Sequence, residues 1–217
     1  TLEELADKRR LRLIYARMLF EAERLVDAEK QYEQVHQQAP NDSDILFALA
    51  LISLEQGKDE AAKGYLNQMI RFNRRANEAH YYLGSIADKN DELPQAISEY
   101  KMVGPGREYL AAQVRIAALL ADQDRLDDAR AHLQNQRANN PERYNRLVMI
   151  EGQLLSERGH EAEFFELLET VIQNQPENVE LLYFRAMTGQ SLGRLDVLEQ
   201  DLLRVIEIDP GTVSYTH

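Results

Sequence analysis

The residue types that most often do chemistry are present here without the spacing that the chemistry needs. The chain has five histidines and no cysteine, and no two histidines stand three or four residues apart, as zinc ligands on one helix do. The histidines are His36, His80, His132, His160 and His217. We therefore expect no metal and no cofactor, while the lack of cysteine leaves both the cytosol and the periplasm open.

Ser98 and Lys101 have the Ser-x-x-Lys spacing of some acyl enzymes, but Tyr100 between them stands at a core position of a helical pattern. The chain has no phosphate-binding Walker loop and no Gly-x-Ser-x-Gly motif. We therefore expect no catalytic residues and no enzyme activity in this chain.

Four aspartates crowd into one short segment, at positions 122, 124, 127 and 128. A calcium-binding EF-hand loop would also need a central glycine and a terminal glutamate, which this segment lacks. We interpret it as a solvated turn followed by a helix cap.

Charge and hydropathy exclude two classes of partner. The chain has 217 residues, with 25 Lys plus Arg against 37 Asp plus Glu, which gives a net charge of -12. Without a basic block, nucleic acid and anionic membrane are not expected as partners. No apolar run approaches the roughly 18 residues that span a bilayer.

Prolines 40, 141, 176 and 210 reveal a repeat, since the intervals between them are 101, 35 and 34 residues and 101 is close to three periods of 34. The repeats start at Arg9, Ser43, Asn77, Leu110, Asn145 and Val179. Counted from these starts, places four, seven, eight, eleven, twenty and twenty-four are mostly apolar or small. In the second repeat they are Leu46, Leu49, Ala50, Ser53, Ala62 and Leu66, and Gly57 stands in the turn.

This pattern resembles the tetratricopeptide repeat family over residues 9–210. The resemblance implies an all-α, right-handed superhelical solenoid of about six helix–turn–helix repeats, in which residues 1–217 form a single solenoid fragment truncated at both ends. Thr1 and Glu4 are a candidate capping box for a first helix that reaches about Glu23.

Some residues depart from the repeat. Glu151 and Arg185 replace the apolar seventh residue, and Phe164 and Leu198 replace the small twentieth, so we expect looser helix crossing in repeats five and six. Gly104-Pro105-Gly106 replaces the end of repeat three with a rigid turn.

Places two, five, nine and twelve of each first helix lie roughly opposite the core stripe. In tetratricopeptide proteins such places line the concave groove that binds partners. An apolar stripe there suits a helix or hydrophobic segment of a protein, although neighbouring first helices would also bury part of it. The predicted partner-binding residues are Leu13, Arg17, Phe20, Phe47, Leu51, Leu54, Tyr81, Val114, Met149, Tyr183 and Met187. The family's carboxylate clamp is absent from the matching places.

Two segments resemble a narrower group. Leu13–Leu19 and Val103–Gly106 look like parts of a bacterial outer-membrane tetratricopeptide lipoprotein that is adaptor to a periplasmic carboxyl-terminal processing protease. This resemblance implies a non-catalytic scaffold on the periplasmic side of the outer membrane, with the protease and its peptidoglycan hydrolase substrates as partners. Its lipid anchor would lie upstream of Thr1.

Two other hypotheses remain open. The apolar faces could serve self-assembly, since the cut end of a solenoid exposes core surface and favours a homo-oligomer. The chain could also be the accessory repeat region of a larger protein.

Overall fold

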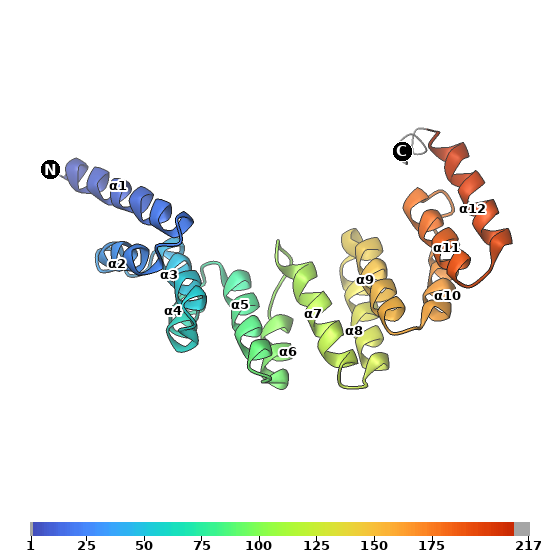
Figure 1. The fold of residues 1–217 in the computed structure, drawn as a ribbon, viewed down its shortest axis with the longest axis horizontal. Coiled ribbons are helices and arrows are strands. Elements are labelled where there is room, and N and C mark those ends of the chain that lie inside the picture. Colours follow the sequence, from blue (N-terminus) through green and yellow to red (C-terminus); the bar gives the residue numbers. More distant parts are fainter. Residues whose placement is uncertain (1, 211–217) are drawn as a thin grey trace. The chain divides into compact units, whose positions relative to one another are not determined.

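The computed structural model describes residues 2–210, with side chains from Asp7 onward, and in this range it contains twelve α-helices, one short 3-10 helix and no strand (Figure 1). The predicted all-α solenoid fold is confirmed. None of the described helices combines the length and apolar character needed to cross a membrane. The helices are α1 (Leu2–Glu21), α2 (Leu25–His36), α3 (Ser43–Glu55), α4 (Asp59–Arg71), α5 (Ala76–Lys89), α6 (Leu93–Lys101), α7 (Tyr109–Ala121), α8 (Leu126–Asn139), η1 (Pro141–Arg143), α9 (Tyr144–Glu157), α10 (Glu161–Ile172), α11 (Val179–Ser191) and α12 (Leu195–Ile208).

The helices form two compact units, residues 1–119 and 120–217. In the first unit each helix from α1 to α6 contacts the next, and in the second the same holds from α8 to α12. A single solenoid over 1–217 stays a prediction.

Every repeat turns at its fifteenth place with a residue in the left-handed region. These residues are Glu23, Gly57, Asp91, Asp124, Gly159 and Gly193, with φ between 57° and 77°. In each repeat the N–H of place sixteen donates to the carbonyl of place eleven at 2.8–3.1 Å, as Lys58 does to Ser53. This is the Schellman end of a helix. The six repeats are therefore in the predicted phase.

The small residue at place twenty is fully buried in the first four repeats, and in the first three it lies where the two helices of the pair approach closely. Those residues are Ala28, Ala62, Ala96 and Ala129.

In the fifth repeat Phe164 occupies the place of that alanine. A Cβ added to Gly152 would lie 2.1 Å from Cε2 of Phe164, so the ring packs directly on the glycine backbone. The α9 and α10 helices have fewer close approaches than the regular pair α3 and α4, as expected. The same expectation is wrong for repeat six, because Arg185 of α11 bonds both carboxylate oxygens of Asp201 of α12, at 2.8 and 2.7 Å, and holds the pair together.

The Gly104-Pro105-Gly106 turn follows a short α6, as predicted. The side-chain amide of Asn77 accepts from the Gly104 N–H at 3.0 Å and donates to the Gly104 carbonyl at 3.1 Å. The turn is thus tied to the start of α5. The α1 helix ends at Glu21, two residues before the predicted end, and the predicted capping box of Thr1 and Glu4 lies outside the residues whose side chains are described.

Candidate functional site: the exposed faces of the first helices

The predicted partner-binding residues all keep some contact with solvent. Arg17, Val114 and Tyr183 are exposed, and the other eight are partly buried. Residues up to Val114 lie in the first unit, whereas Met149, Tyr183 and Met187 lie in the second, so each set is described by itself.

On α1 the predicted stripe is mostly used within the molecule. Leu13 packs against Val35 and Ile45, and Phe20 packs against the cluster around Ile52. Arg17 points to solvent and pairs with Glu21 at 2.9 Å. Leu13 and Phe20 are therefore buried by neighbouring helices, which is the alternative to partner binding given above.

An aromatic row runs across α3, α5 and α6 of the first unit. We define it as Phe47, Tyr82, Tyr81 and Tyr100, whose successive ring centroids lie 5.4, 5.7 and 5.7 Å apart. Tyr100 is buried against Gly84, while the other three rings are partly exposed. Phe47 and Tyr81 were predicted for the site; Tyr82 joins them because it is next to Tyr81 and turns its ring toward α3.

Arg75 closes one end of the aromatic row. Its guanidinium carbon lies 4.1 Å from the centroid of the Phe47 ring, within cation–π range. The same side chain bonds Asp44 at 2.8 Å and Glu78 at 3.0 Å. Arg75 reaches this position because its backbone is left-handed, with φ of 50°, immediately before α5. No sequence pattern signals that conformation in an arginine.

Asp88 and Arg115 close the other end. The Tyr100 hydroxyl donates to Asp88 Oδ2 at 3.3 Å, and two nitrogens of Arg115 donate to the same oxygen at 2.9 and 2.6 Å. Burial raises the pKa of Tyr100 to about 12, and the charge of Asp88 adds to the rise. Burial likewise raises the pKa of Tyr82, with smaller effects of Tyr81 and Glu108. Both phenols therefore stay protonated at neutral pH.

In the second unit the predicted residues are less closely connected. Met149 packs against the core cluster that contains Val148 and Leu155. Tyr183 is exposed, and its ring meets Phe184 at 6.0 Å. Among the described residues of the second unit, the predicted residues do not form a series of touching rings like the aromatic row.

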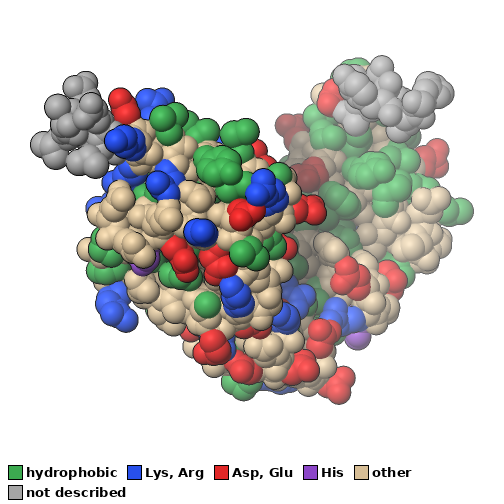
Figure 2. Space-filling model, turned by 60° about the vertical axis from the view of Figure 1, so that its left-hand side comes forward, with side chains coloured by type: hydrophobic (Ala, Val, Ile, Leu, Met, Phe, Trp, Pro, Cys, Tyr) green, Lys and Arg blue, Asp and Glu red, His purple; other side chains and the backbone are tan. Residues whose placement is uncertain are grey.

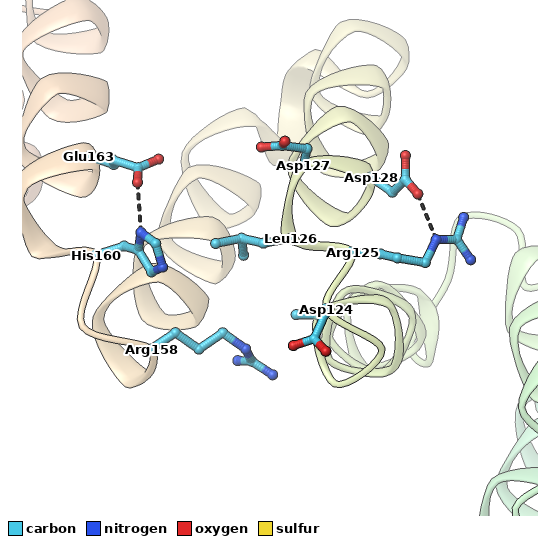
Figure 3. Close-up of a pocket in the computed structure, with 9 residues that line it drawn as sticks. Asp124, Arg125, Leu126, Asp127, Asp128, Arg158, His160 and Glu163 are labelled. Carbon is cyan, nitrogen blue, oxygen red and sulfur yellow. Dashed lines mark hydrogen bonds and ion pairs between the residues drawn. The ribbon is translucent and has the colours of Figure 1, made fainter.

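A polar pocket lies at the turns before α8 and α10 (Figure 3). Its carboxylates already have partners: Arg125 bonds Asp128 at 2.7 Å, and a ring nitrogen of His160 contacts Glu163 at 2.6 Å. Nearby, Arg158 bonds Asp122 at 2.5 Å. Within the described residues no group of three or more acidic, histidine or cysteine side chains could hold a metal ion.

The aspartate segment is a turn, as interpreted, and three of its four aspartates flank this pocket. The interpretation as a helix cap is wrong. The N-cap of α8 is Arg125, and its side chain makes no capping hydrogen bond, because none of the aspartates falls at that position.

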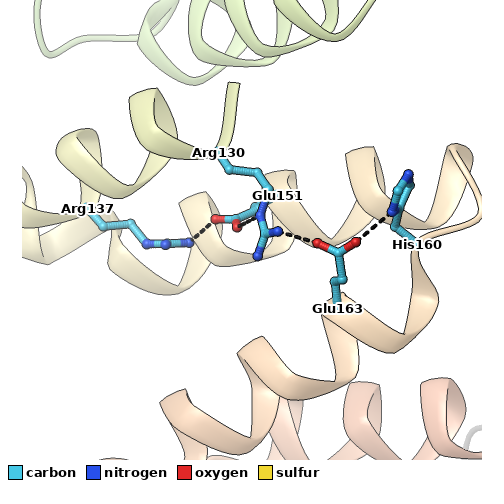
Figure 4. A network of polar contacts seen from close by, with 5 residues as sticks. All are labelled: Arg130, Arg137, Glu151, His160 and Glu163. Carbon is cyan, nitrogen blue, oxygen red and sulfur yellow. Dashed lines mark hydrogen bonds and ion pairs between the residues drawn. The ribbon is translucent and has the colours of Figure 1, made fainter. Parts of the chain in front are cut away.

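A buried ion network crosses α8, α9 and α10 (Figure 4). Glu151 accepts from Arg137 at 2.5 Å and from Arg130 at 3.1 Å, and Arg130 also bonds Glu163, which contacts His160. Glu151 and Arg137 are both buried. The sequence showed Glu151 as a departure from the repeat, but its partners stand in another repeat and were missed.

Six helix pairs with the same Schellman turn at the same place define a tetratricopeptide repeat solenoid. The tetratricopeptide repeat family model matches residues 19–86. The chain has a tetratricopeptide-like solenoid fold and homology to a TPR repeat-containing protein of Pseudomonas aeruginosa, to which it is 34% identical over 132 residues. The match covers 61% of this chain and 22% of the relative, so the chain spans a small part of that protein's length.

Solved structures show the same fold. Pseudomonas aeruginosa PilF has a TM-score of 0.56 at 12% identity, over 97% of this chain and 96% of that one. A tetratricopeptide repeat protein from Parabacteroides merdae has a TM-score of 0.57 at 17% identity, over 93% of this chain and 80% of that one. Proteins with such repeats are generally non-catalytic interaction modules, and the fold suggests a protein–protein interaction scaffold.

Proposed function

We propose that this chain is a scaffold that binds a hydrophobic segment of a partner protein along the aromatic row. The observation that carries the proposal is the row itself, in which Phe47, Tyr81 and Tyr82 keep accessible surface although their rings touch. Aromatic side chains supply large contact area with few torsions to freeze, which is why they dominate binding hot spots.

The chemistry at the ends of the row favours an apolar segment over a charged one. Arg75 already bonds Asp44 and Glu78, and Arg115 already bonds Asp88. A partner carboxylate would have to displace these ion pairs. An amphipathic helix that lays its apolar side on the rings, with polar groups near the Tyr82 hydroxyl, matches the surface better.

The finer proposal names the partners. The scaffold acts as adaptor to a periplasmic carboxyl-terminal processing protease and presents peptidoglycan hydrolases to it, on the periplasmic side of a bacterial outer membrane, where a lipid anchor would hold the protein. Two things support this: the resemblance of Leu13–Leu19 and Val103–Gly106 to such an adaptor, and homology to a bacterial repeat protein. A cytoplasmic location is the alternative.

The test is direct binding of the purified chain to purified carboxyl-terminal processing protease and to peptidoglycan hydrolases, measured by calorimetry. Tyr81→Ala should weaken binding at least about tenfold, as loss of a hot-spot ring does. Gln134→Ala is the control, because Gln134 is exposed on α8, in the other unit, and is not among the predicted partner-binding residues.

The outcomes separate the two levels of the proposal. Binding of either protein that Tyr81→Ala weakens and Gln134→Ala leaves unchanged supports both. If neither protein binds, the adaptor role is refuted. If binding is strong but indifferent to Tyr81→Ala, the aromatic row is not the site.

A further inference from the structure

Two connections of the first unit differ from those of other repeats in the residue that caps the end of the second helix. In four repeats this C-cap residue is polar: it is Gln37, Asn140, Gln173 or Asp209. After α4 it is Phe72, and after α6 it is Met102. Phe72 is 37% exposed and Met102 is 61% exposed, so two apolar side chains face solvent where the fold accepts polar ones.

Basic side chains surround these two caps. We define the basic edge as the caps and the four cations in or next to their connections: Arg71, Phe72, Arg74, Lys101, Met102 and Arg107. All four cations are exposed. Among the described residues, none of their side chains makes an ion pair or a hydrogen bond.

The two connections touch each other, so the basic edge is one surface. The side-chain amide of Asn77, at the start of α5, bonds the Gly104 backbone and also donates to the Pro105 carbonyl at 3.4 Å. Both connections lie at the upper ends of their helices in Figure 1. Burial raises the pKa of Tyr82 of α5, and the charge of Arg107 opposes that rise, which places Arg107 near α5 as well.

A pocket opens beside the first cap. Phe72 and Arg74 line it together with residues 41–43 before α3, and its volume is about 450 Å³. The carboxylate of Asp42 in this pocket already bonds Arg9 at 2.6 Å and accepts two N–H bonds at the start of α3. Arg74 therefore remains available to a carboxylate from outside the chain.

The other carboxylates near the basic edge do not neutralise it. Asp44 and Glu78 both bond Arg75, at 2.8 and 3.0 Å. Glu108 stands next to Arg107 and balances one charge at most. The edge thus keeps a clear excess of positive charge in a chain whose net charge is -12.

Exposed cations at other places in the first unit do have carboxylate partners. Arg17 pairs with Glu21 at 2.9 Å, and Lys63 pairs with Glu60 at 2.9 Å. Figure 2 shows acidic side chains over much of the visible face, several of them beside basic ones. Free cations that gather around two exposed apolar caps therefore need an explanation of their own.

The helix ends explain only part of the basic edge. The partial negative charge of a helix C-terminus stabilises a basic side chain in the last turn, which applies to Arg71 and Lys101. It does not apply to Arg74 and Arg107, which lie outside the helices, or to the apolar caps. A partner with carboxylates and apolar groups would account for the cations and the caps together.

We propose that the basic edge binds a short segment of a partner protein in which acidic residues are interspersed with apolar ones. Carboxylates of the segment pair with the four cations. One apolar side chain enters the pocket beside Phe72, and another covers Met102. This surface is separate from the aromatic row, and the proposal does not depend on the row.

A short acidic segment suits this chain better than nucleic acid or an anionic membrane. Those polyanions carry negative charge over a large area, so they would also meet the acidic remainder of the chain. A short segment meets only the basic edge. Its attraction to the four cations should weaken as salt is added.

Fluorescence anisotropy of a labelled peptide with the full 217-residue chain tests the proposal, at low ionic strength. The peptide consists of glutamates with a leucine at every third place, and it should bind. A peptide with glutamine in place of every glutamate should bind at least about tenfold more weakly. A peptide with serine in place of every leucine should bind at least about threefold more weakly.

Removal of three cations should abolish most of the binding. Arg71→Gln/Arg74→Gln/Arg107→Gln should raise the dissociation constant of the acidic peptide about tenfold or more, because each exposed ion pair changes it by up to about fivefold. All three side chains are exposed, so circular dichroism should show unchanged helix content.

A matched variant controls for net charge. Lys8→Gln/Arg10→Gln/Lys30→Gln removes the same charge from exposed side chains of α1 and α2, and it should change the dissociation constant by less than about twofold. Tyr81→Ala should leave peptide binding unchanged, which separates this surface from the aromatic row.

Three results would overturn the proposal. The unmodified chain could fail to bind the acidic peptide. The control variant could weaken binding as much as the variant of the basic edge. Single-stranded DNA or phosphatidylglycerol vesicles could bind more tightly than the peptide and lose binding in the variant of the basic edge, which would assign the surface to a polyanion.

Discussion

Replacing Glu151 by leucine tests whether the ion network of the second unit is structural. Leucine is the residue type that the repeat pattern favours at this place, so a propensity argument predicts a gain in stability. The structure predicts a loss. Without Glu151 the buried Arg137 guanidinium, whose side chain is 9% exposed, has no carboxylate partner.

The magnitude follows from the two arginines. Breaking a buried pair by removing one partner costs about 3–5 kcal/mol. Arg130 is less buried and keeps Glu163, so the loss arises mainly at Arg137. We therefore expect about 3 kcal/mol, near the lower end of that range. In a unit of residues 120–217 this corresponds to a fall in melting temperature of roughly 12–24 °C.

Urea unfolding followed by circular dichroism measures the change. Glu157→Leu on the same helix is the control, because Glu157 is exposed and its replacement should change the unfolding free energy by less than about 0.5 kcal/mol. The double variant Glu151→Leu/Arg137→Leu should recover most of the loss, since it removes the unpaired charge. A loss below about 1 kcal/mol for Glu151→Leu, or a double variant less stable than the single one, would refute the reasoning.

Three further predictions use the same unfolding assay. Gly152→Ala should destabilise the second unit by about 2 kcal/mol, because the new Cβ would lie 2.1 Å from the Phe164 ring, and adding Phe164→Ala should relieve that clash. Glu23→Gly should stabilise the first unit by about 1 kcal/mol, because φ at Glu23 is 58° and glycine adopts that conformation without strain. Tyr100 keeps its proton to about pH 12 in the folded chain, so its contribution to the free energy of unfolding is complete below pH 10. Between pH 10 and 12 that contribution declines by up to about 1.4 kcal/mol per pH unit. Tyr100→Phe should remove this part of the decline in stability.

The repeat phase could be predicted because the signals that set it are local. Turn glycines such as Gly57 and small residues such as Ala62 act within one helix pair. Both helices of the pair lie within one repeat, so the repeat's own sequence contains both sides of the helix–helix contact. The turn residues that are not glycine, such as Glu23, were not predicted, and the structure shows them in the left-handed conformation at the same place of the repeat.

The polar departures from the repeat could be found but not explained. Glu151 and Arg185 stand at the same place of successive repeats, yet their partners differ: Arg137 precedes Glu151 by 14 residues, and Asp201 follows Arg185 by 16. The repeat pattern describes what each place contains, not which place of which repeat it touches. A long side chain such as Arg185 can bond a residue of the other helix that the repeat pattern does not specify. The expectation of looser packing in repeat six was therefore wrong.

For the candidate site, the sequence predicted two rings of the aromatic row but not the residues that surround them. Phe47 and Tyr81 follow from helical periodicity. Arg75 comes over the Phe47 ring only because its backbone is left-handed before α5, a conformation that arginine seldom adopts. Periodicity also did not separate Leu13, whose surface is used within the molecule, from Tyr81, whose surface is not fully used.

The most direct test of the central claim, that the aromatic row binds a protein partner, is site-specific photo-crosslinking in a bacterial cell-envelope extract. A photoreactive phenylalanine analogue replaces Tyr81 in one sample and the exposed Gln134 of α8 in the other, and crosslinked peptides are identified by mass spectrometry. The account predicts one recurrent partner segment, apolar on one helical face, crosslinked at position 81 and absent at position 134. The same peptides at both positions, or crosslinks at position 134 alone, would contradict it.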